Sequence, residues 1–403
     1  MSTKSTENKK LVLILLAHKF KNHYLYRFNV NEFINEKNIK IEIHQLIDFI
    51  NPKFKKAFQR NDNHKTLKIF KTYKSWIGQM KNLKKIYGKD IIIINTVQSI
   101  SMISLRINFF IKKKNFKTLD YIYKFSLANT PYKKLDLKEF LNIFIFNQKK
   151  IYNLLKIKTF LFLANFLQVT PDFSIKTGKF SYVNKNKKTK IISGNSDDFN
   201  VFLSQKKIKI NQSRTKKFGL FLEAPTPLFE GDTFITKDDP KIFGDPKIWA
   251  KRLDIFFNFL ETNLDLKIKI APHPKVFHKS KFPKYYFGRE IINYNLNDIA
   301  KYSKLFISRS STAMGYAVMC NKPSLFITTN TLIQGPKYQL QKTLSSEFGT
   351  QPINIDNHFD LTELKEALKI NKKKYLEYKF KYLTSRHDKK TNFELIKELI
   401  NKL

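Results

Sequence analysis

Two short segments carry side chains that can hold a phosphate group, and each follows a short apolar run typical of a β-strand. In the segment 271–274, His273 lies between two prolines. The segment 308–312 holds three serines, Arg309 and a threonine. Ligands of open parallel sheets bind beyond the carboxyl ends of the strands. The two segments therefore indicate a site for a phosphorylated ligand such as a nucleotide.

The histidine of the first segment is held by its neighbours. Pro272 and Pro274 restrict the backbone, and Pro274 disfavours the helical region for His273 itself. The imidazole is then expected in an extended loop, where it can donate to a phosphate or protonate a leaving group near neutral pH. The alternative is a histidine that only caps the edge of a strand. We assign His273 a catalytic role and Pro274 to the phosphate-binding segment.

The serine segment is predicted to lead into a helix that begins at about Thr312. Ser310 and Ser311 would then lie at its N-terminus, where free N–H groups, hydroxyls and the helix dipole favour an anion. The alternative is an ordinary N-cap. Small residues in the predicted helix would let it approach the sheet closely: Ala313, Gly315 and Ala317. The predicted phosphate-binding residues of this segment are Ser308, Arg309, Ser310, Ser311 and Thr312.

Three carboxylates follow the predicted strand 218–222. Glu223 directly follows the strand, while Glu230 and Asp232 flank a glycine that would allow a tight turn. Each could serve as a general base, and each alone is equally well explained as a solvated surface group. The position of the segment after a strand, rather than its residue types, makes it a candidate.

Alternating apolar runs and helical patterns predict an α/β fold with parallel sheets covered on both faces. We expect two Rossmann-like domains in series whose parallel sheets face a central cleft. The predicted domains are 1–205, which includes a basic helical region at 107–169, and 218–385; 206–217 is a linker and 386–403 a closing helix. Strands are predicted at 11–16, 39–45, 90–95, 189–193, 218–222, 266–270, 304–307 and 324–327, and helices at 24–35, 65–86, 246–261, 361–368, 372–382 and 392–403.

The net charge of +42 first raises the possibility of a nucleic-acid partner. Only eight of the 75 basic residues are arginine, however, whereas a specific nucleic-acid binder would use arginine for bidentate contacts. Lys, Asn, Ile and Phe share A/T-rich codons, so base composition explains much of the charge. We therefore predict no specific nucleic-acid partner.

The lone cysteine, Cys320, excludes an intrachain disulfide and a multi-thiolate metal site, and indicates a reducing compartment. The most apolar later stretch, 159–169, has about half of the ~20 residues that a spanning helix needs. The basic region 107–169 has two interpretations: helices with solvated lysines, or peripheral contact with an anionic membrane. The expected location is the cytoplasm, with the inner membrane face as the site of any such contact.

The order of these segments resembles the bacterial sialyltransferases and polysialyltransferases. It is still more similar to surface-carbohydrate biosynthesis proteins with a serine-rich loop, a small-residue helix and an Asn-Lys-Pro entry to the next strand, here at 321–323. The resemblance covers about 218–329. It implies a GT-B fold and a metal-independent, inverting glycosyltransferase of capsule or lipopolysaccharide assembly. His273 would contact the phosphate of a CMP-activated sugar and assist its departure, and Ser310 and Ser311 would bind that phosphate.

The chain departs from the family in the third motif, where two acidic residues and a glycine are expected. Phe229-Glu230-Gly231 keeps one acid, so Glu223 and Asp232 remain alternatives to Glu230 as the base. The implied partners are a nucleotide sugar and a carbohydrate or lipid-linked acceptor, with no other cofactor. Alternative functions are a CDP-glycerol-type polyol-phosphate transferase and a non-catalytic sugar-binding relative. A nonhydrolysing UDP-sugar epimerase is less favoured because the several acids it requires are not evident in the sequence, and a basic nucleic-acid-binding protein is less favoured because only the charge supports it.

Overall fold

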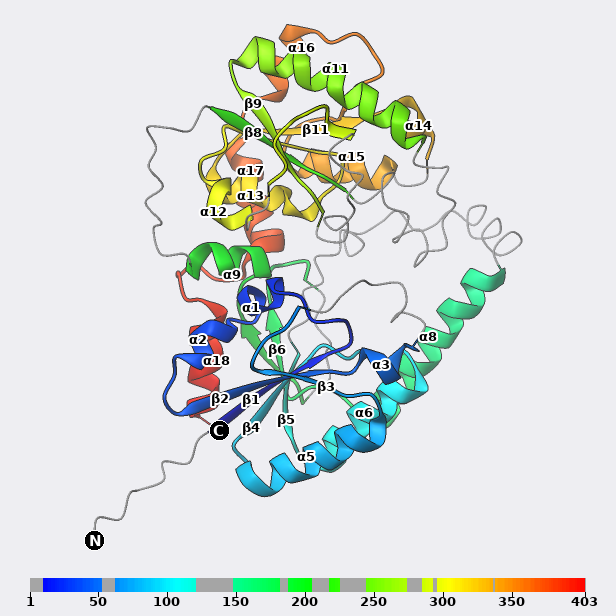
Figure 1. Ribbon diagram of the computed structural model, residues 1–403, viewed down its shortest axis with the longest axis vertical. Coiled ribbons are helices and arrows are strands. Elements are labelled where there is room, and N and C mark those ends of the chain that lie inside the picture. Colours follow the sequence, from blue (N-terminus) through cyan, green and yellow to red (C-terminus); the bar gives the residue numbers. More distant parts are fainter. Residues whose placement is uncertain are drawn as a thin grey trace. The chain divides into compact units, whose positions relative to one another are not determined.

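A computed structural model shows that the chain forms two compact units. Unit 1 comprises Met1–Asn200 and Thr384–Leu403, and unit 2 comprises Val201–Leu383. The predicted closing helix thus belongs to unit 1 (Figure 1). The structure describes residues 10–52, 62–120, 148–181, 188–204, 217–224, 244–273, 285–292, 296–335 and 338–402.

Unit 1 is built on a seven-stranded sheet in the order β3-β2-β1-β4-β5-β6-β7, with every neighbouring pair parallel. The order from β3 to β6 is that of a Rossmann fold. The central strands β1 and β4 are almost wholly apolar and buried because helices cover both faces. The strands are β1 (Lys10–Leu16), β2 (Ile39–Gln45), β3 (Leu67–Ile69), β4 (Ile91–Asn95), β5 (Lys117–Asp120), β6 (Phe173–Lys176) and β7 (Lys190–Ser193).

Two hydrophobic clusters cover the faces of this sheet. One contains Phe33 of α2 and Ile396 of α18, and the other contains Trp76 of α5 and Ile107 of α6. Alternate residues of β1 enter the two clusters, as the pleat of a strand requires. The described helices of unit 1 are α1 (His23–Arg27), α2 (Val30–Ile34), α3 (Ile47–Ile50), α5 (Tyr73–Tyr87), α6 (Met102–Lys113), α8 (Gln148–Phe166) and α18 (Asn392–Asn401), together with the first half of α9 (Asp197–Ser204), whose last four residues belong to unit 2.

Two sequence predictions in unit 1 are wrong. The predicted helix 24–35 is divided into α1 and α2 because Asn29 adopts a left-handed conformation with φ 51°. The predicted helix 65–86 begins only at Tyr73, after the N-cap Thr72, and its first residues form β3. As an edge strand, β3 is largely exposed and lacks the apolar run that marks the central strands.

Unit 2 is built on a five-stranded parallel sheet in the order β12-β11-β10-β8-β9. This is the flavodoxin-like strand order, since the first strand of the unit lies between the second and the third. The strands are β8 (Phe218–Leu222), β9 (Lys267–Ala271), β10 (Leu305–Ser308), β11 (Ser324–Thr328) and β12 (Ile353–Asn354).

Helix α11 (Pro246–Leu264), the longest of the described helices in unit 2, begins where its sequence signals place it. The side chain of Asp245 accepts from Lys247 N at 2.6 Å, and proline occupies the first turn. The predicted helix 372–382 ends early and continues as a π-helical turn at Lys379–Leu383. The helices are α11 (Pro246–Leu264), α12 (Leu296–Ala300), α13 (Gly315–Cys320), α14 (Asn330–Gln334), α15 (Tyr338–Glu347), α16 (Leu361–Ala367) and α17 (Lys372–Tyr378), with a 3-10 turn at Thr312–Met314.

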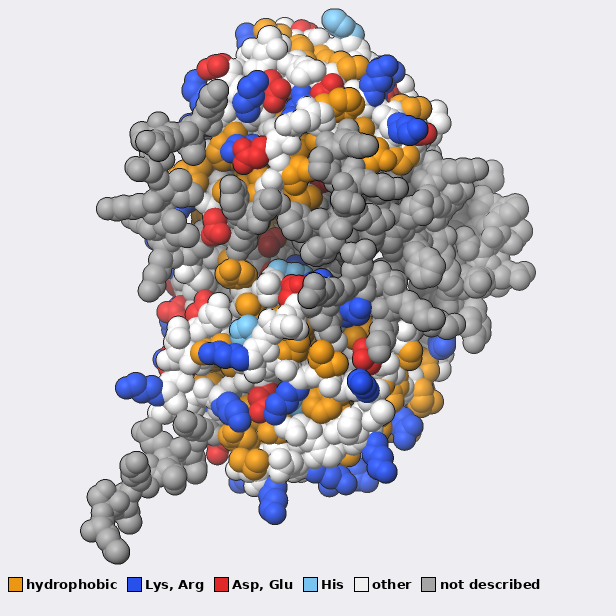
Figure 2. All heavy atoms as spheres, in the orientation of Figure 1, with side chains coloured by type: hydrophobic (Ala, Val, Ile, Leu, Met, Phe, Trp, Pro, Cys, Tyr) orange, Lys and Arg blue, Asp and Glu red, His pale blue; other side chains and the backbone are white. Residues whose placement is uncertain are grey.

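The two parallel-sheet units confirm the predicted α/β, GT-B-like fold of two Rossmann-like domains. That the two sheets face a central cleft stays a prediction. Much of the predicted basic region, at 121–147, and nearly all of the predicted linker lie outside the described residues. Lysine and arginine side chains are spread over the visible described surface rather than gathered in one patch (Figure 2). This face of the described residues therefore shows no single basic patch.

Candidate functional site

Three strand ends meet at the carboxyl edge of the sheet in unit 2. Leu222 of β8 pairs with Ser308 of β10 on one side and with Ala271 of β9 on the other. The residues that directly follow these three strands therefore lie at the same edge of the sheet, and Glu223 is the one that follows β8. From β8 the chain forms β9 on one side and β10 on the other, so this is the topological switch point at which open α/β sheets bind ligands.

Glu223 is a buried acid at this edge. Its backbone N–H donates to Ala271 O at 3.1 Å, and the residue is 3% exposed. Neither carboxylate oxygen makes a hydrogen bond of normal geometry in the described part of the chain. Burial raises the pKa of Glu223 to about 7, while the Tyr286 hydroxyl and the charge of Arg309 oppose that rise. A carboxyl group with this pKa can accept or donate a proton at neutral pH.

Arg309 supplies positive charge beside this acid. It is 6% exposed, and its guanidinium carbon lies 5.8 Å from the centre of the Trp249 ring. Burial lowers the pKa of Arg309 to about 10 and the charge of Glu223 acts in the opposite direction, so the guanidinium stays protonated at neutral pH. A buried cation at a switch point is suited to an anionic ligand.

Tyr286 belongs to the same cluster although sequence reasoning gave it no role. It is buried, and burial followed by the charge of Glu223 raises the pKa of its hydroxyl. It lies beyond the end of β9, outside any motif, so no sequence signal marked it. Trp249 was recognised only as part of the buried stripe of α11.

Ser308 has a structural role in this loop. Its fully buried hydroxyl donates to Leu222 O at 2.8 Å and accepts from Ser311 N at 3.0 Å. These bonds tie the ends of β8 and β10 to the start of the next turn. The phosphate-binding role predicted for this hydroxyl stays a prediction, and a ligand would have to compete with both bonds.

The turn after the serines differs from the predicted helix start. A 3-10 turn occupies Thr312–Met314, and the α-helix begins only at Gly315. Ser311 caps the turn, since its side chain accepts from Ala313 N at 3.2 Å and its carbonyl accepts from Met314 N at 3.1 Å. Ser310 is half-buried and Thr312 exposed, and their phosphate-binding roles stay predictions.

Gly315, one of the small residues after the serines, lies against the π-helical turn and α17. A Cβ atom added at Gly315 would lie 3.1 Å from Leu383 Cδ2, and its other nearest neighbours belong to Leu383 and Tyr378. Gly315 therefore allows the π-helical turn and α17 to approach α13. The predicted reason, close approach to the sheet, is wrong for this residue.

His273 lies two residues beyond the end of β9 and is half-buried. The structure thus brings it to the same edge of the sheet as Glu223 and Arg309, and its catalytic role stays a prediction. Pro274, Glu230 and Asp232 lie outside the described residues.

Unit 1 has its own switch point, between β1 and β4, and sequence reasoning gave this edge no role. His18 follows β1 and is exposed. Thr96 follows β4, and its hydroxyl donates to Leu15 O at 2.7 Å. The signal that could have marked this edge is the histidine just beyond the first strand.

The described ranges lack both a metal-binding cluster and a helix that could cross a membrane. They contain no group of three or more His, Cys, Asp or Glu side chains that could hold a metal ion. No helix there is long and apolar enough to cross a membrane.

No protein-family model matches the sequence, and no curated protein matches it. Among solved structures, the chain is similar to UDP-GlcNAc 2-epimerase from Methanocaldococcus jannaschii, with 12% identity, a TM-score of 0.49 and coverage of 97% of this chain and 99% of the other. It is also similar to the wall teichoic acid polymerase TagF, with 13% identity, a TM-score of 0.47 and coverage of 98% of this chain and 89% of the other. A third similar structure is MnaA from S. aureus, solved with UDP, with 12% identity, a TM-score of 0.45 and coverage of 93% of this chain and 92% of the other. Similarity at this level assigns no activity or substrate to the chain.

Proposed function

We propose that this chain is a glycosyltransferase that uses a nucleotide-activated sugar, with the donor phosphate at the carboxyl edge of the sheet in unit 2. The proposal rests on Glu223, a buried acid whose pKa is raised to about 7. It lies at the switch point, between the strand that leads to His273 and the strand that leads to Arg309. A proton-transfer group beside groups that favour an anion is what glycosyl transfer from a phosphate requires.

The reaction would use these groups as follows. Ionised Glu223 takes the proton of an acceptor hydroxyl, and the hydroxyl oxygen attacks the anomeric carbon of the donor. The bond between that carbon and the phosphate oxygen breaks, and the electron pair leaves with the phosphate. Arg309 and His273 stabilise the released anion, aided by Ser310 and Ser311. Attack opposite the leaving group inverts the anomeric centre, and no metal ion takes part.

For the donor we propose a CMP-linked sugar, and for the role the assembly of a bacterial surface polysaccharide. Both rest on the resemblance of the segments 271–274 and 308–323 to the surface-carbohydrate biosynthesis proteins. A panel of CMP, CDP-glycerol and UDP-GlcNAc, read by the thermal unfolding midpoint, tests the donor. Stabilisation by CMP alone is expected. Stronger stabilisation by CDP-glycerol would show that the donor is a CDP-linked polyol rather than a CMP-linked sugar. A properly folded protein that binds none of the three would overturn the transferase assignment.

The catalytic roles are tested with two variants and matched controls. Glu223→Gln and His273→Ala are each expected to lower turnover by about 10²- to 10⁴-fold, the usual contribution of a general acid or base. The exposed residues Glu290 and His358 provide the controls Glu290→Gln and His358→Ala, which should retain wild-type turnover. Near-wild-type turnover in Glu223→Gln would remove this residue from the mechanism.

A further inference from the structure

Helix α8 of unit 1 turns a line of large apolar side chains toward solvent. Leu155, Phe162 and Phe166 are 58%, 68% and 76% exposed. Phe162 lies two helical turns after Leu155, and Phe166 lies one turn after Phe162, so the three side chains share one side of the helix. Ala164, 6% exposed, lies on the opposite side and faces the protein. A set of exposed large apolar side chains on one side of a helix is typical of an interaction surface.

The charged side chains of α8 and α6 (Met102–Lys113) have a single sign. Lys156 and Lys158 are exposed between the apolar positions. Neither α8 nor α6, which packs against it, contains an aspartate or glutamate. On α6, Met102 and Phe109 are also exposed, at 58% and 42%. The two helices therefore combine exposed apolar groups with basic side chains and have no acidic side chain of their own.

These properties favour an anionic lipid surface as the partner. Apolar side chains on such a helix insert at the level of the lipid headgroups, and lysines beside them meet lipid phosphates. A second copy of the chain is disfavoured, because pairing two copies of α8 would bring its lysines together without any carboxylate on α8 or α6 to compensate them. We propose that the α8 face, defined as Leu155, Lys156, Lys158, Phe162 and Phe166, docks the protein on an anionic phospholipid bilayer without crossing it.

Helix α11 of unit 2 provides a matched control. It has the same length as α8, 19 residues, and also exposes two apolar side chains two turns apart. These are Ile248 and Ile255, at 63% and 45% exposed. Unlike α8, it carries Asp254 and Glu261 among its basic residues. Its mixed charge should give it little affinity for an anionic bilayer.

Cosedimentation of the full chain with lipid vesicles tests the proposal. Wild-type protein should sediment with vesicles of phosphatidylglycerol and phosphatidylethanolamine, less so at high salt, and much less with pure phosphatidylcholine vesicles. Phe162→Gln/Phe166→Gln should weaken binding by about tenfold or more. Lys156→Gln/Lys158→Gln should weaken it by roughly fivefold for each lysine. Ile248→Gln/Ile255→Gln should bind as wild type, and circular dichroism should show all three variants folded.

Several outcomes would overturn the proposal. One is equal binding to anionic and neutral vesicles, and another is an equal loss in the α11 variant. A third is a wild-type dimer in sedimentation velocity that Phe162→Gln/Phe166→Gln converts to monomer without lipid, which would assign the α8 face to self-association. Tight binding of a single-stranded RNA that the same variants abolish would assign it to nucleic acid. None of these measurements depends on the proposed enzyme activity.

Discussion

The side chain of Asn392 hydrogen-bonds both backbone groups of Asn195, which lies 197 residues earlier in the chain. Asn195 N donates to Asn392 Oδ1 at 2.9 Å, and Asn392 Nδ2 donates to Asn195 O at 2.8 Å. Both residues are fully buried. The Asn392 amide thus pairs with both backbone groups of Asn195, as a neighbouring strand would. It thereby holds the start of α18 just beyond the end of β7.

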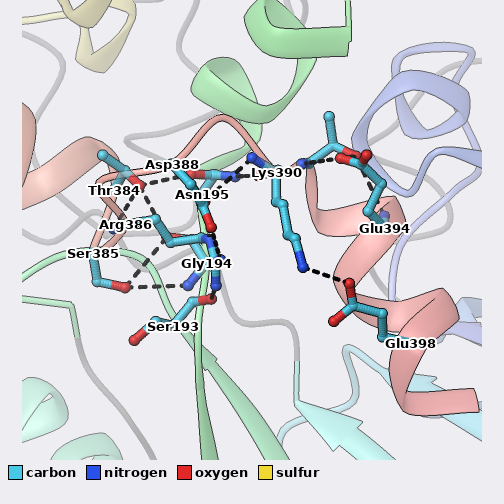
Figure 3. A network of polar contacts seen from close by, with 11 residues as sticks. Ser193, Gly194, Asn195, Thr384, Ser385, Arg386, Asp388, Lys390, Glu394 and Glu398 are labelled. Carbon is cyan, nitrogen blue, oxygen red and sulfur yellow. Dashed lines mark hydrogen bonds and ion pairs between the residues drawn. The ribbon is translucent and has the colours of Figure 1, made fainter.

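Other bonds hold the segment that returns from unit 2 to unit 1 (Figure 3). Thr384 Oγ1 donates to Asn195 Oδ1 at 2.6 Å, and Ser385 Oγ donates to Lys176 O at 2.6 Å. Arg386 Nη1 donates to Ser193 O at 3.0 Å. The return segment is therefore fixed to unit 1 from its first residue, Thr384.

Replacing Asn392 with alanine should destabilise the protein by about 2–6 kcal/mol. The substitution leaves the buried N–H and C=O of Asn195 without their partners, and each such group costs about 1–3 kcal/mol. Urea unfolding measures the loss. Asn263→Ala, at an exposed position of α11, serves as the control and should change stability by about 0.5 kcal/mol or less. Equal effects of the two substitutions would contradict a fastening role for Asn392.

The sequence predicted the elements whose signals are local. Strands β1, β4 and β8 were found because their runs are uniformly apolar, and α11 because Asp245 and a proline mark its start. Edge strand β3 was missed because its exposed residues are not patterned. The return of the C-terminal segment to unit 1 was not predicted, since it depends on bonds between residues nearly two hundred positions apart.

The candidate site shows the same limit. Glu223, His273 and the serines were found because they follow recognisable strands, and their common edge follows from the parallel sheet. Arg309 directly follows β10 and therefore shares this edge, whereas the proximity of Tyr286 to Glu223 depends on how the chain beyond β9 returns to the sheet. No pattern in the sequence encodes that, so the raised pKa of Glu223 emerged only from the structure.

Alanine should have opposite effects at two glycines of unit 1. A Cβ atom at Gly194 would lie 2.5 Å from Ile175 Cγ2 and 3.0 Å from Asn392 Oδ1, so Gly194→Ala should cost about 1–3 kcal/mol. Gly78, in α5, has no atom within 4 Å of its added Cβ. Gly78→Ala should instead stabilise the helix by about 0.5–1 kcal/mol. Thermal and urea unfolding of both variants check the signs, and a neutral Gly194→Ala would show that Ile175 can move aside.

Glu42 should contribute stability that is lost in acid. Burial alone would raise its pKa, but the hydrogen bond with His44 at 3.3 Å and the ion pair with Lys68 at 2.9 Å outweigh it and lower the pKa to about 2. The stabilisation is complete above the unfolded pKa of 4.5 and lost as the pH falls through about 2. Since Lys68 is partly exposed, we expect Glu42→Gln to cost on the order of 1–2 kcal/mol at pH 7.

Urea unfolding of Glu42→Gln and wild type between pH 7 and pH 2 measures this contribution. The difference in unfolding free energy should shrink as the pH falls, because protonated Glu42 resembles glutamine. Glu366→Gln, at an exposed position of α16, is the control and should show little difference at any pH. A difference for Glu42→Gln that stays constant with pH would mean that its effect is steric rather than ionic.

Glu223 should have the opposite dependence on pH. Because burial raises its pKa from 4.5 to about 7, the folded protein keeps a proton that the unfolded chain releases between these values. Wild-type stability from this group therefore falls as the pH rises through that window, whereas Glu223→Gln stays neutral. Between pH 5 and pH 8 the variant should gain on the order of 2–3 kcal/mol relative to wild type in urea unfolding.

If Glu223 is also the base, wild-type turnover should rise with pH and level off above about 7, and the small residual turnover of the variant should lack that rise. Parallel stability curves for the two proteins would show that Glu223 is already ionised at pH 5, and would remove the observation on which the proposed function rests.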